Sequence, residues 1–291
     1  MGGRPLPEGR GSAKHSERAL EPILRAHLLR KIDGLLVELL KSLGPNDWET
    51  QTIAPQWKVK DVAAHLLDTQ LRKLSIVRDG YQTEAPEIRS PTDLVSFVNR
   101  LNQDGVRVYR RLSPPVLIAL LEEGSQQSAA FHEALDPFAP AVFSVSWAGE
   151  TISPNWFDTV RELTERWHHQ EQIRLAVNRP GIQTPELYHP VLDCFLRALP
   201  YRYRDVPASP GTLLRFDVVG DCGGTWLLER EADQWRLVSH SAAKPVSRVT
   251  IPQEIAWRIF TKGMAEITRA VEVEGDKELG LHILGMTAIV G

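Results

Sequence analysis

The sequence predicts a protein of two parts, a mostly helical part followed by a smaller part that combines strands and helices. Long segments with apolar residues at helical spacing fill the chain as far as residue 177. Residues 178–181, Asn-Arg-Pro-Gly, then interrupt this pattern. Beyond them, short runs rich in β-branched and aromatic residues are separated by turn residues, and Phe216 and Val218 alternate with charged neighbours. Such alternation is typical of a sheet with one face in water.

The first part is expected to contain five helices, because the apolar-periodic segments are separated by loops with proline, glycine or asparagine. The segments cover residues 19–43, 59–78, 92–112, 116–135 and 155–177. Gly124 leaves open a break in the fourth helix, since glycine weakens a helix interior. Residues 141–148 are apolar and rich in β-branched and aromatic side chains, so they fit either a strand or an ordered loop packed on the helices.

The second part is expected to be a small α+β domain. Its helices are predicted at residues 185–199, 252–260 and 277–286. Its strands are predicted at residues 212–219, 225–230, 234–240 and 247–251, with residues 271–274 as a candidate fifth strand. We therefore divide the chain into a disordered arm at residues 1–17, a helical bundle at 18–181 and an α+β domain at 182–291.

Composition is that of an ordinary soluble protein and excludes several partners. The formal net charge is -3 and charges of both signs are well mixed, which argues against nucleic acid or a membrane surface as partner. No apolar run approaches the roughly 20 residues needed to span a bilayer, and the N-terminal residues lack the apolar core of a signal peptide. Cys194 and Cys222 do not form a CxxC pair, so we expect a cytoplasmic protein in a reducing compartment.

The helix at residues 155–177 carries a candidate pair of metal ligands. Glu165 and His169 are four residues apart, which places them on one helix face, one turn apart. His65 lies at the margin of the apolar face of the helix at residues 59–78, where protein covers it in part, and it is the candidate third ligand. Two imidazoles and a carboxylate from two helices form a three-ligand metal site with an open coordination position.

The same spacing also fits a helix face in water that binds nothing. Asp158 and Glu162 extend the stripe formed by Glu165 and His169, and polar stripes of this kind are common on solvated helices. The stripe nevertheless runs on into Ala176, next to further apolar side chains, and a helix with apolar residues on two sides is expected to be covered on both.

Two neighbouring side chains are alternatives or additions to the ligand set. His168 lies three residues from Glu165 and is a rival to His169, unless it supports the site or lies at the surface. Asp68 lies one turn after His65 and fits a fourth ligand, a hydrogen-bond acceptor for a ligand imidazole, or a plain surface carboxylate.

Two blocks of sequence resemble the DinB-like metalloproteins, and within them the mycothiol-dependent maleylpyruvate isomerase type. One block is WKVKDVAAHL at residues 57–66, a tryptophan followed by a helix that carries a ligand histidine. The other is ERWHHQEQIR at residues 165–174, which is similar to that family's Glu-x-x-x-His block. WRIFTKG at residues 257–263 and VEGDKELG at residues 273–280 resemble its sterol-carrier-like C-terminal domain, so the likeness covers nearly all of the chain after the N-terminal arm.

The resemblance implies an up-and-down four-helix bundle in which His65, Glu165 and His169 bind a divalent cation, usually zinc, with nickel as an alternative. It also implies that a low-molecular-weight thiol adds to a small-molecule substrate while the metal stabilises the thiolate. The chain departs from the family at two places. Gln172 stands where relatives commonly have aspartate, and Lys262-Gly263 stands where they often have Gly-Arg, which puts a basic contact to a substrate anion there in doubt.

Three functions are compatible with these features. The first is a metal-dependent thiol transferase or thiol-dependent isomerase, although maleylpyruvate itself is not the expected substrate because many relatives carry that label by resemblance only. The second is a metal-dependent hydrolase that uses metal-bound water at the same site. The third is a protein that binds a small apolar ligand in its C-terminal domain and holds a structural metal. The oligomeric state is open, with a homodimer among the options.

Overall fold

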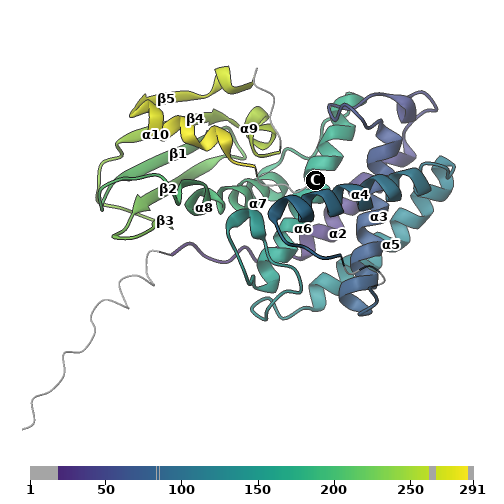
Figure 1. Cartoon of the computed structure of the whole chain (residues 1–291). Coiled ribbons are helices and arrows are strands. Elements are labelled where there is room, and N and C mark those ends of the chain that lie inside the picture. Colours follow the sequence, from purple (N-terminus) through teal and green to yellow (C-terminus); the bar gives the residue numbers. More distant parts are fainter. Residues whose placement is uncertain (1–18, 83, 85, 262–266, 288–291) are drawn as a thin grey trace, which may run out of the picture.

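The computed structural model describes residues 19–82, 84, 86–261 and 267–287, so the arm expected at residues 1–17 lies outside the described residues. Helices occupy the chain as far as Ala176, and two further helices lead into a five-stranded sheet (Figure 1). The predicted fold class, a helical part followed by an α+β part, is therefore confirmed. No helix among the described residues is both long enough and apolar enough to cross a membrane.

The helices of the first part begin and end close to the predicted residues. They are α2 (His27–Lys41), α3 (Val59–Lys73), α4 (Pro91–Tyr109), α5 (Pro114–Ala134) and α6 (Asn155–Ala176). A π-helical turn at Leu74–Arg78 extends α3, and short 3-10 turns lie at Asp47–Glu49 and Ser146–Ala148. Local signals set these limits, as at α4, where the Ser90 hydroxyl accepts a hydrogen bond from the Asp93 N–H and proline occupies the first turn.

Three predictions for the first part are corrected or resolved. The first helix begins at His27 and not at residue 19, because Pro22 lacks an N–H and disfavours helical backbone at Glu21. Helix α5 continues through Gly124 without a break. Residues 141–148 form an ordered loop that ends in a 3-10 turn and not a strand, and the Val145 N–H donates to the Ser153 hydroxyl at 2.9 Å.

The second part is a mixed sheet with helices. The helices are α7 (Pro185–Leu196), α8 (Leu199–Tyr203), α9 (Gln253–Phe260) and α10 (Lys277–Leu281), with 3-10 turns at Ile267–Ala270 and His282–Gly285. The strands are β1 (Leu213–Val219), β2 (Gly224–Arg230), β3 (Trp235–Val238), β4 (Ser247–Pro252) and β5 (Glu272–Gly275). Their order is β3-β2-β1-β4-β5, in which β1 and β4 are parallel and the other neighbours are antiparallel.

Helix α6 joins the two parts through one aromatic side chain. Trp167 stacks on Tyr188 of α7 with ring centroids 4.2 Å apart, and its indole N–H donates to the carbonyl of Ile182 at 3.0 Å. Trp257 of α9 meets the same indole edge-on. One hydrophobic cluster therefore continues from α2 and α6 through α7 into the sheet, and a second lies among α2, α3 and α5.

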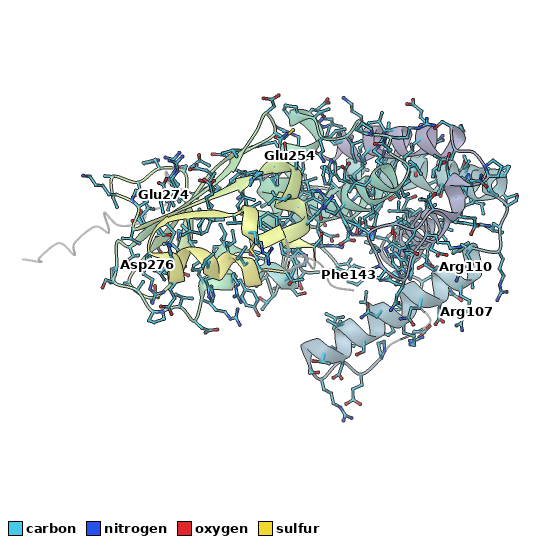
Figure 2. All side chains as sticks on the ribbon, turned by 90° about the horizontal axis from the view of Figure 1, so that it is seen from above. Arg107, Arg110, Phe143, Glu254, Glu274 and Asp276 are labelled. Atoms are coloured by element: carbon cyan, nitrogen blue, oxygen red, sulfur yellow. The ribbon has the colours of Figure 1, made fainter. Side chains whose placement is uncertain are left out.

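Helix α4 is attached to the bundle more loosely than its neighbours. Gly105 packs so closely on α3 that a Cβ atom there would lie 2.2 Å from Cγ of Asp68. Next to it, Val106 is buried, but the rest of the helix is half-buried or exposed. Figure 2 shows the end of α4 that carries Arg107 and Arg110 beside the other helices, while the rest of it extends away. The closest approach of α4 to the bundle is therefore near its C-terminal end, at Gly105 and Val106, and a hydrogen bond of 2.9 Å from Arg72 of α3 to Asn102 adds to it.

Replacing Gly105 with alanine is expected to lower the free energy of unfolding by about 1–3 kcal/mol, because the added methyl group overlaps the Asp68 carboxylate and displaces it from its packing under α4 and its ion pair with Arg72. Gly34 is the matched control, since it also lies inside a helix but a Cβ atom there meets nothing within 4 Å. Gly34→Ala is expected to stabilise by about 0.5–1 kcal/mol. Chemical denaturation measures both changes, and equal stabilisation by the two substitutions would contradict the close packing of α4.

Candidate metal centre

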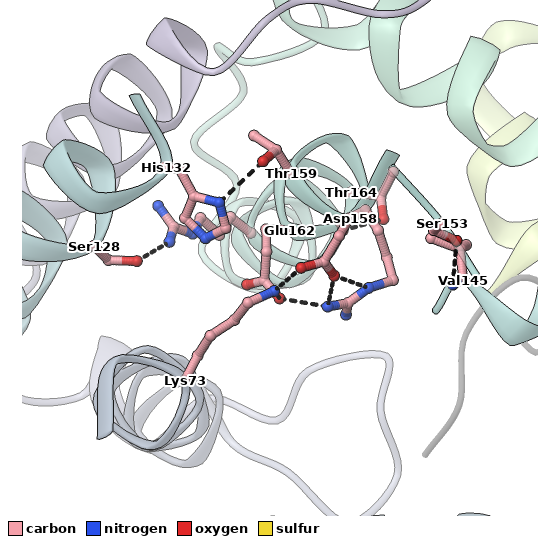
Figure 3. Close-up of polar contacts among 11 residues, drawn as sticks. Lys73, Ser128, His132, Val145, Ser153, Asp158, Thr159, Glu162 and Thr164 are labelled. Atoms are coloured by element: carbon pink, nitrogen blue, oxygen red, sulfur yellow. Dashed lines mark hydrogen bonds and ion pairs between the residues drawn. The ribbon is translucent and has the colours of Figure 1, made fainter. Parts of the chain in front are cut away.

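The N-terminal half of the polar stripe on α6 is buried in an ion-pair network and is not in water. The Lys73 ammonium of α3 lies 2.7 Å from the Asp158 carboxylate and 2.8 Å from that of Glu162. Arg161 contacts the same two carboxylates at 2.6 and 2.8 Å (Figure 3). Burial alone would raise the pKa of both carboxyls, but Lys73 and Arg161 outweigh it and hold both pKa values below the ordinary range. Two cations therefore neutralise two buried anions.

A second group of buried polar side chains continues this network towards α2 and α5. Arg166 forms an ion pair with Asp33 and donates to the Ser128 hydroxyl at 2.7 Å. Nδ1 of His132 is hydrogen-bonded to the Thr159 hydroxyl at 3.1 Å (Figure 3). Burial lowers the pKa of His132 to about 3, so its imidazole is neutral. Sequence reasoning missed this group because its members lie on separate helices without a shared spacing.

The three side chains predicted as ligands lie together where the network ends. His65 comes from α3, and Glu165 and His169 come from adjacent turns of α6; one candidate ligand atom from each lies within 4.8 Å of the other two. Glu165 Oε2 is 3.7 Å from Nε2 of His169, and the His65 and His169 rings have centroids 4.5 Å apart. The fold thus brings together side chains that are about 100 residues apart in the sequence.

Neighbouring groups hold the two imidazoles in position. Gln172 Oε1 lies 3.0 Å from Nδ1 of His169; with the proton on Nδ1, this contact is a hydrogen bond that leaves Nε2 with a free lone pair. The Trp57 ring covers both imidazoles, with centroids 4.7 Å from His65 and 5.8 Å from His169. Nδ1 of His65 is buried and has no hydrogen-bond partner among the described residues.

The protonation states of the two imidazoles suit metal ligands. Burial lowers the pKa of His169 to about 3 and that of His65 well below its ordinary value, so both imidazoles are neutral. Burial raises the pKa of Glu165. Among the described residues, Glu165 forms no ion pair with a lysine or arginine, in contrast to Glu162 and Asp158, which lie one and two turns earlier. Even a half-buried carboxylate loses part of its hydration, and a bound metal ion would compensate for that loss.

The two other candidate ligands lie differently. His168 is buried, but its Nδ1 donates to the backbone carbonyl of Thr164 at 2.9 Å, and the residue is not part of the three-residue cluster. Its ring lies against that of His169, with centroids 3.9 Å apart. Asp68 forms an ion pair with Arg72 at 3.0 Å and packs under α4, so it is neither a ligand nor a plain surface carboxylate.

A cavity of about 980 Å³ opens beside the cluster. Its walls come from α3, α4 and α6, from the loop around Trp57, from the loop around Phe143, and from the end of α9. Phe143 lies between the bundle and the sheet (Figure 2). Cavities of this size next to a few converging polar groups are the usual form of small-molecule sites.

Arg258 of α9 is a functional candidate that the sequence did not single out. It lines the cavity, it forms no ion pair with another described residue, and its Nε is buried without a partner. A half-buried guanidinium without a close ion-pair partner is suited to binding an anionic ligand. Helical spacing placed Arg258 in a helix, but no local pattern indicated that this helix would face the bundle. Lys262 and Gly263, where a basic contact was in doubt, lie outside the described residues.

A helical bundle with a His-Glu-His cluster beside a cavity defines a class of candidate metalloproteins, and comparison with known families identifies the class. The family model described as the mycothiol maleylpyruvate isomerase N-terminal domain matches residues 29–174, half of the chain. The chain belongs to this family. Both sequence blocks that carried the resemblance, at residues 57–66 and 165–174, lie inside the matched region, so the predicted family is confirmed.

Solved structures support the same fold. The crystal structure of the mycothiol-dependent maleylpyruvate isomerase is similar at 12% identity with a TM-score of 0.53, over 87% of this chain and 93% of that chain. A mutant of that isomerase, with a histidine replaced by alanine, has the same identity and coverage and a TM-score of 0.50. An SCP2-type ubiquinone synthesis protein, UbiJ, matches 34% of this chain and 83% of its own at 20% identity, with a TM-score of 0.23 that is too low to bear on the fold. No curated protein matches the sequence.

Replacing Lys73 with methionine is expected to lower the free energy of unfolding by about 3 kcal/mol, because it leaves Asp158 and Glu162 to share the Arg161 guanidinium. Lys41→Met is the matched control. Lys41 also pairs with a glutamate, Glu122, at 2.9 Å, but both side chains are about half exposed, so a change below about 1 kcal/mol is expected. Urea denaturation of both variants tests the difference, and similar values would show that the buried network contributes nothing special.

Proposed function

We propose that this chain is a metal-dependent enzyme of the thiol-dependent isomerase or thiol transferase type, in which His65, Glu165 and His169 bind a divalent cation. Zinc is the first choice and nickel the alternative. The observation that carries the proposal is Glu165, a half-buried carboxylate next to two neutral imidazoles and without a lysine or arginine ion-pair partner among the described residues. Membership of the mycothiol maleylpyruvate isomerase family supports a small-molecule substrate and a low-molecular-weight thiol.

The residues present fit such an ion. A tetrahedral zinc with Zn–N bonds of about 2.0–2.1 Å has ligand atoms roughly 3.3 Å apart, and the three candidate atoms already lie within 4.8 Å of one another. A buried nitrogen without a partner costs about 1–3 kcal/mol, and coordination at Nδ1 of His65 would remove that cost. When bound, the ion would lower the pKa of a thiol or water at its open position and so supply a nucleophile at neutral pH.

The remaining parts of the site would orient the reactants and exclude water. Gln172 keeps the His169 ring in the orientation and tautomer of a ligand. Trp57 shields one side of both imidazoles from solvent. Arg258 would hold a carboxylate or similar anion of the substrate in the same cavity, which replaces the basic contact that Lys262-Gly263 left in doubt.

Several wider expectations belong with this proposal. We place a boundary between a bundle at residues 18–181 and an α+β domain at residues 182–291, where Asn178 adopts a left-handed φ of 51° after α6. The hydrophobic cluster that crosses this boundary suggests that the two parts fold as one unit. We expect the protein in the reducing cytoplasm, without a nucleic-acid or membrane partner, and we retain a homodimer as an option.

Elemental analysis of the purified protein tests the ion site. We expect close to one zinc or nickel ion per chain in the wild type and less than about a tenth of that in Glu165→Ala, because loss of one of three ligands removes the charge that balances the cation. His65→Ala is expected to lose the ion in the same way. His168→Ala is the control, and it should retain the ion because His168 is not part of the three-residue cluster. A wild type without stoichiometric metal would overturn the proposal.

Trial turnover with and without a low-molecular-weight thiol separates the proposed reaction from hydrolysis. For the zinc-loaded wild type, we expect isomerisation or thiol transfer to require the thiol and to saturate with it, since the thiolate is the proposed nucleophile. Glu165→Ala should lose this activity at every thiol concentration. Turnover that is unchanged when thiol is omitted would favour a metal-dependent hydrolase that uses water at the same site.

A further inference from the structure

The wall that α4 contributes to the cavity is mainly apolar. Four aliphatic or aromatic side chains of its N-terminal half line the cavity and are half-buried: Leu94, Phe97, Val98 and Leu101. Among the described residues, none covers these four side chains completely, and the close approach of α4 to α3 at Gly105 lies towards the other end of the helix. The α4 wall is therefore an apolar surface that faces an open space.

Other apolar side chains lie around the same space. Ile53 and Trp57 come from the loop before α3, and Phe143 and Trp147 come from the loop before α6. Isolated apolar side chains at a protein surface are ordinary, but a concave apolar lining is characteristic of a binding site. The volume of about 980 Å³ lies at the upper end of the roughly 300–1,000 Å³ usual for drug-sized ligands. A small, fully polar substrate would leave most of this lining in contact with water.

The charged side chains around the cavity indicate the charge of the ligand. Four of its five basic side chains already have partners: Arg72 with Asp68, Lys73 and Arg161 with Asp158 and Glu162, and Arg166 with Asp33. Arg258 is the one of the five that forms no close ion pair with another described residue; the carboxylate that it influences electrostatically, Glu171, does not line the cavity. Glu165 lines the cavity but belongs to the proposed ion site, so Arg258 is the cation left for a ligand. One such cation together with a large apolar wall matches a molecule with one anionic group and a sizeable hydrocarbon part.

We propose that the cavity binds an amphipathic organic acid, with its hydrocarbon part against the α4 wall and its anionic group at Arg258. The assignment of this molecule as the substrate of the metal centre rests on the proposed function. The binding itself does not, because neither the α4 wall nor Arg258 belongs to the His65, Glu165 and His169 cluster. The substrate class is then a hydrophobic monoacid and not a small, compact dicarboxylate.

A chain-length series tests the apolar wall. The full-length protein, treated with a chelator and separately loaded with zinc, is titrated by calorimetry with butyrate, hexanoate, octanoate and decanoate. We expect affinity to rise about threefold to fourfold for each methylene group that is buried, and to rise in both forms of the protein. Equal affinity for butyrate and decanoate would overturn the proposal.

Matched substitutions on α4 locate the binding. Val98 lines the cavity, whereas Val95, three residues earlier on the same helix, is exposed and does not line it. Val98→Asn is expected to weaken decanoate binding by about tenfold and butyrate binding hardly at all, because a polar group then faces the hydrocarbon. Val95→Asn should leave both unchanged. An equal effect of the two substitutions would place the hydrocarbon elsewhere and contradict the proposal.

A substitution at Arg258 tests the anionic end. Arg258→Gln is expected to weaken octanoate binding by at least about tenfold while it leaves binding of octanol unchanged, because only the carboxylate needs the guanidinium. Loss of both ligands to the same extent would contradict the assignment. If affinity rises with chain length but the purified protein holds no metal, the binding inference stands and the proposed metal-dependent reaction is wrong. If the protein holds stoichiometric metal but its affinity does not change with chain length, the metal site stands and the binding inference is wrong.

Discussion

The structure depends on how helix α6 balances the charges that it carries into the interior. One side of α6 must be apolar to pack against α7 and α9, and the opposite side is covered by α3, so Asp158 and Glu162 are shielded from bulk water. Asp158 and Glu162 are neutralised by Lys73 and Arg161. A buried ion pair contributes little net stability but is costly to break. The network therefore fixes the rotation of α6 about its axis and, with it, the direction in which the next carboxylate points.

Glu165 is the point at which this balance changes. The cations that serve the two earlier carboxylates end with Arg161, and the neighbours that Glu165 meets instead are the neutral imidazoles of His65 and His169. Neutral imidazole can donate an electron pair to a metal but cannot compensate a negative charge. The stripe on α6 thus changes from internal charge balance to the cluster at which we propose that a cation binds.

How far this could be predicted from the sequence depends on the range of the interactions involved. Helix limits such as Ser90 with Pro91 follow from contacts within a few residues, and the two family blocks predicted that His65 and Glu165 would lie close together, as they do. The late start of α2 was missed because apolar periodicity outweighed the effect of Pro22. The burial of Glu162 was not predictable, because its partner Lys73 lies 89 residues away and neither position reveals the other.

A ligand at the apolar wall of the cavity would affect the electrostatics of the polar wall, because both walls border the same water-filled space. A hydrocarbon group against α4 would displace solvent from the space beside His169, and charges interact more strongly where water is excluded. A hydrophobic substrate would therefore strengthen the electrostatic interactions that the proposed chemistry uses, whereas a small polar one would leave them screened. The wall that does this is also the least constrained one, since α4 is anchored mainly around Gly105. Changing residues 94–101 would then alter which hydrocarbon fits, at little cost to the charge balance along α6 that orients Glu165.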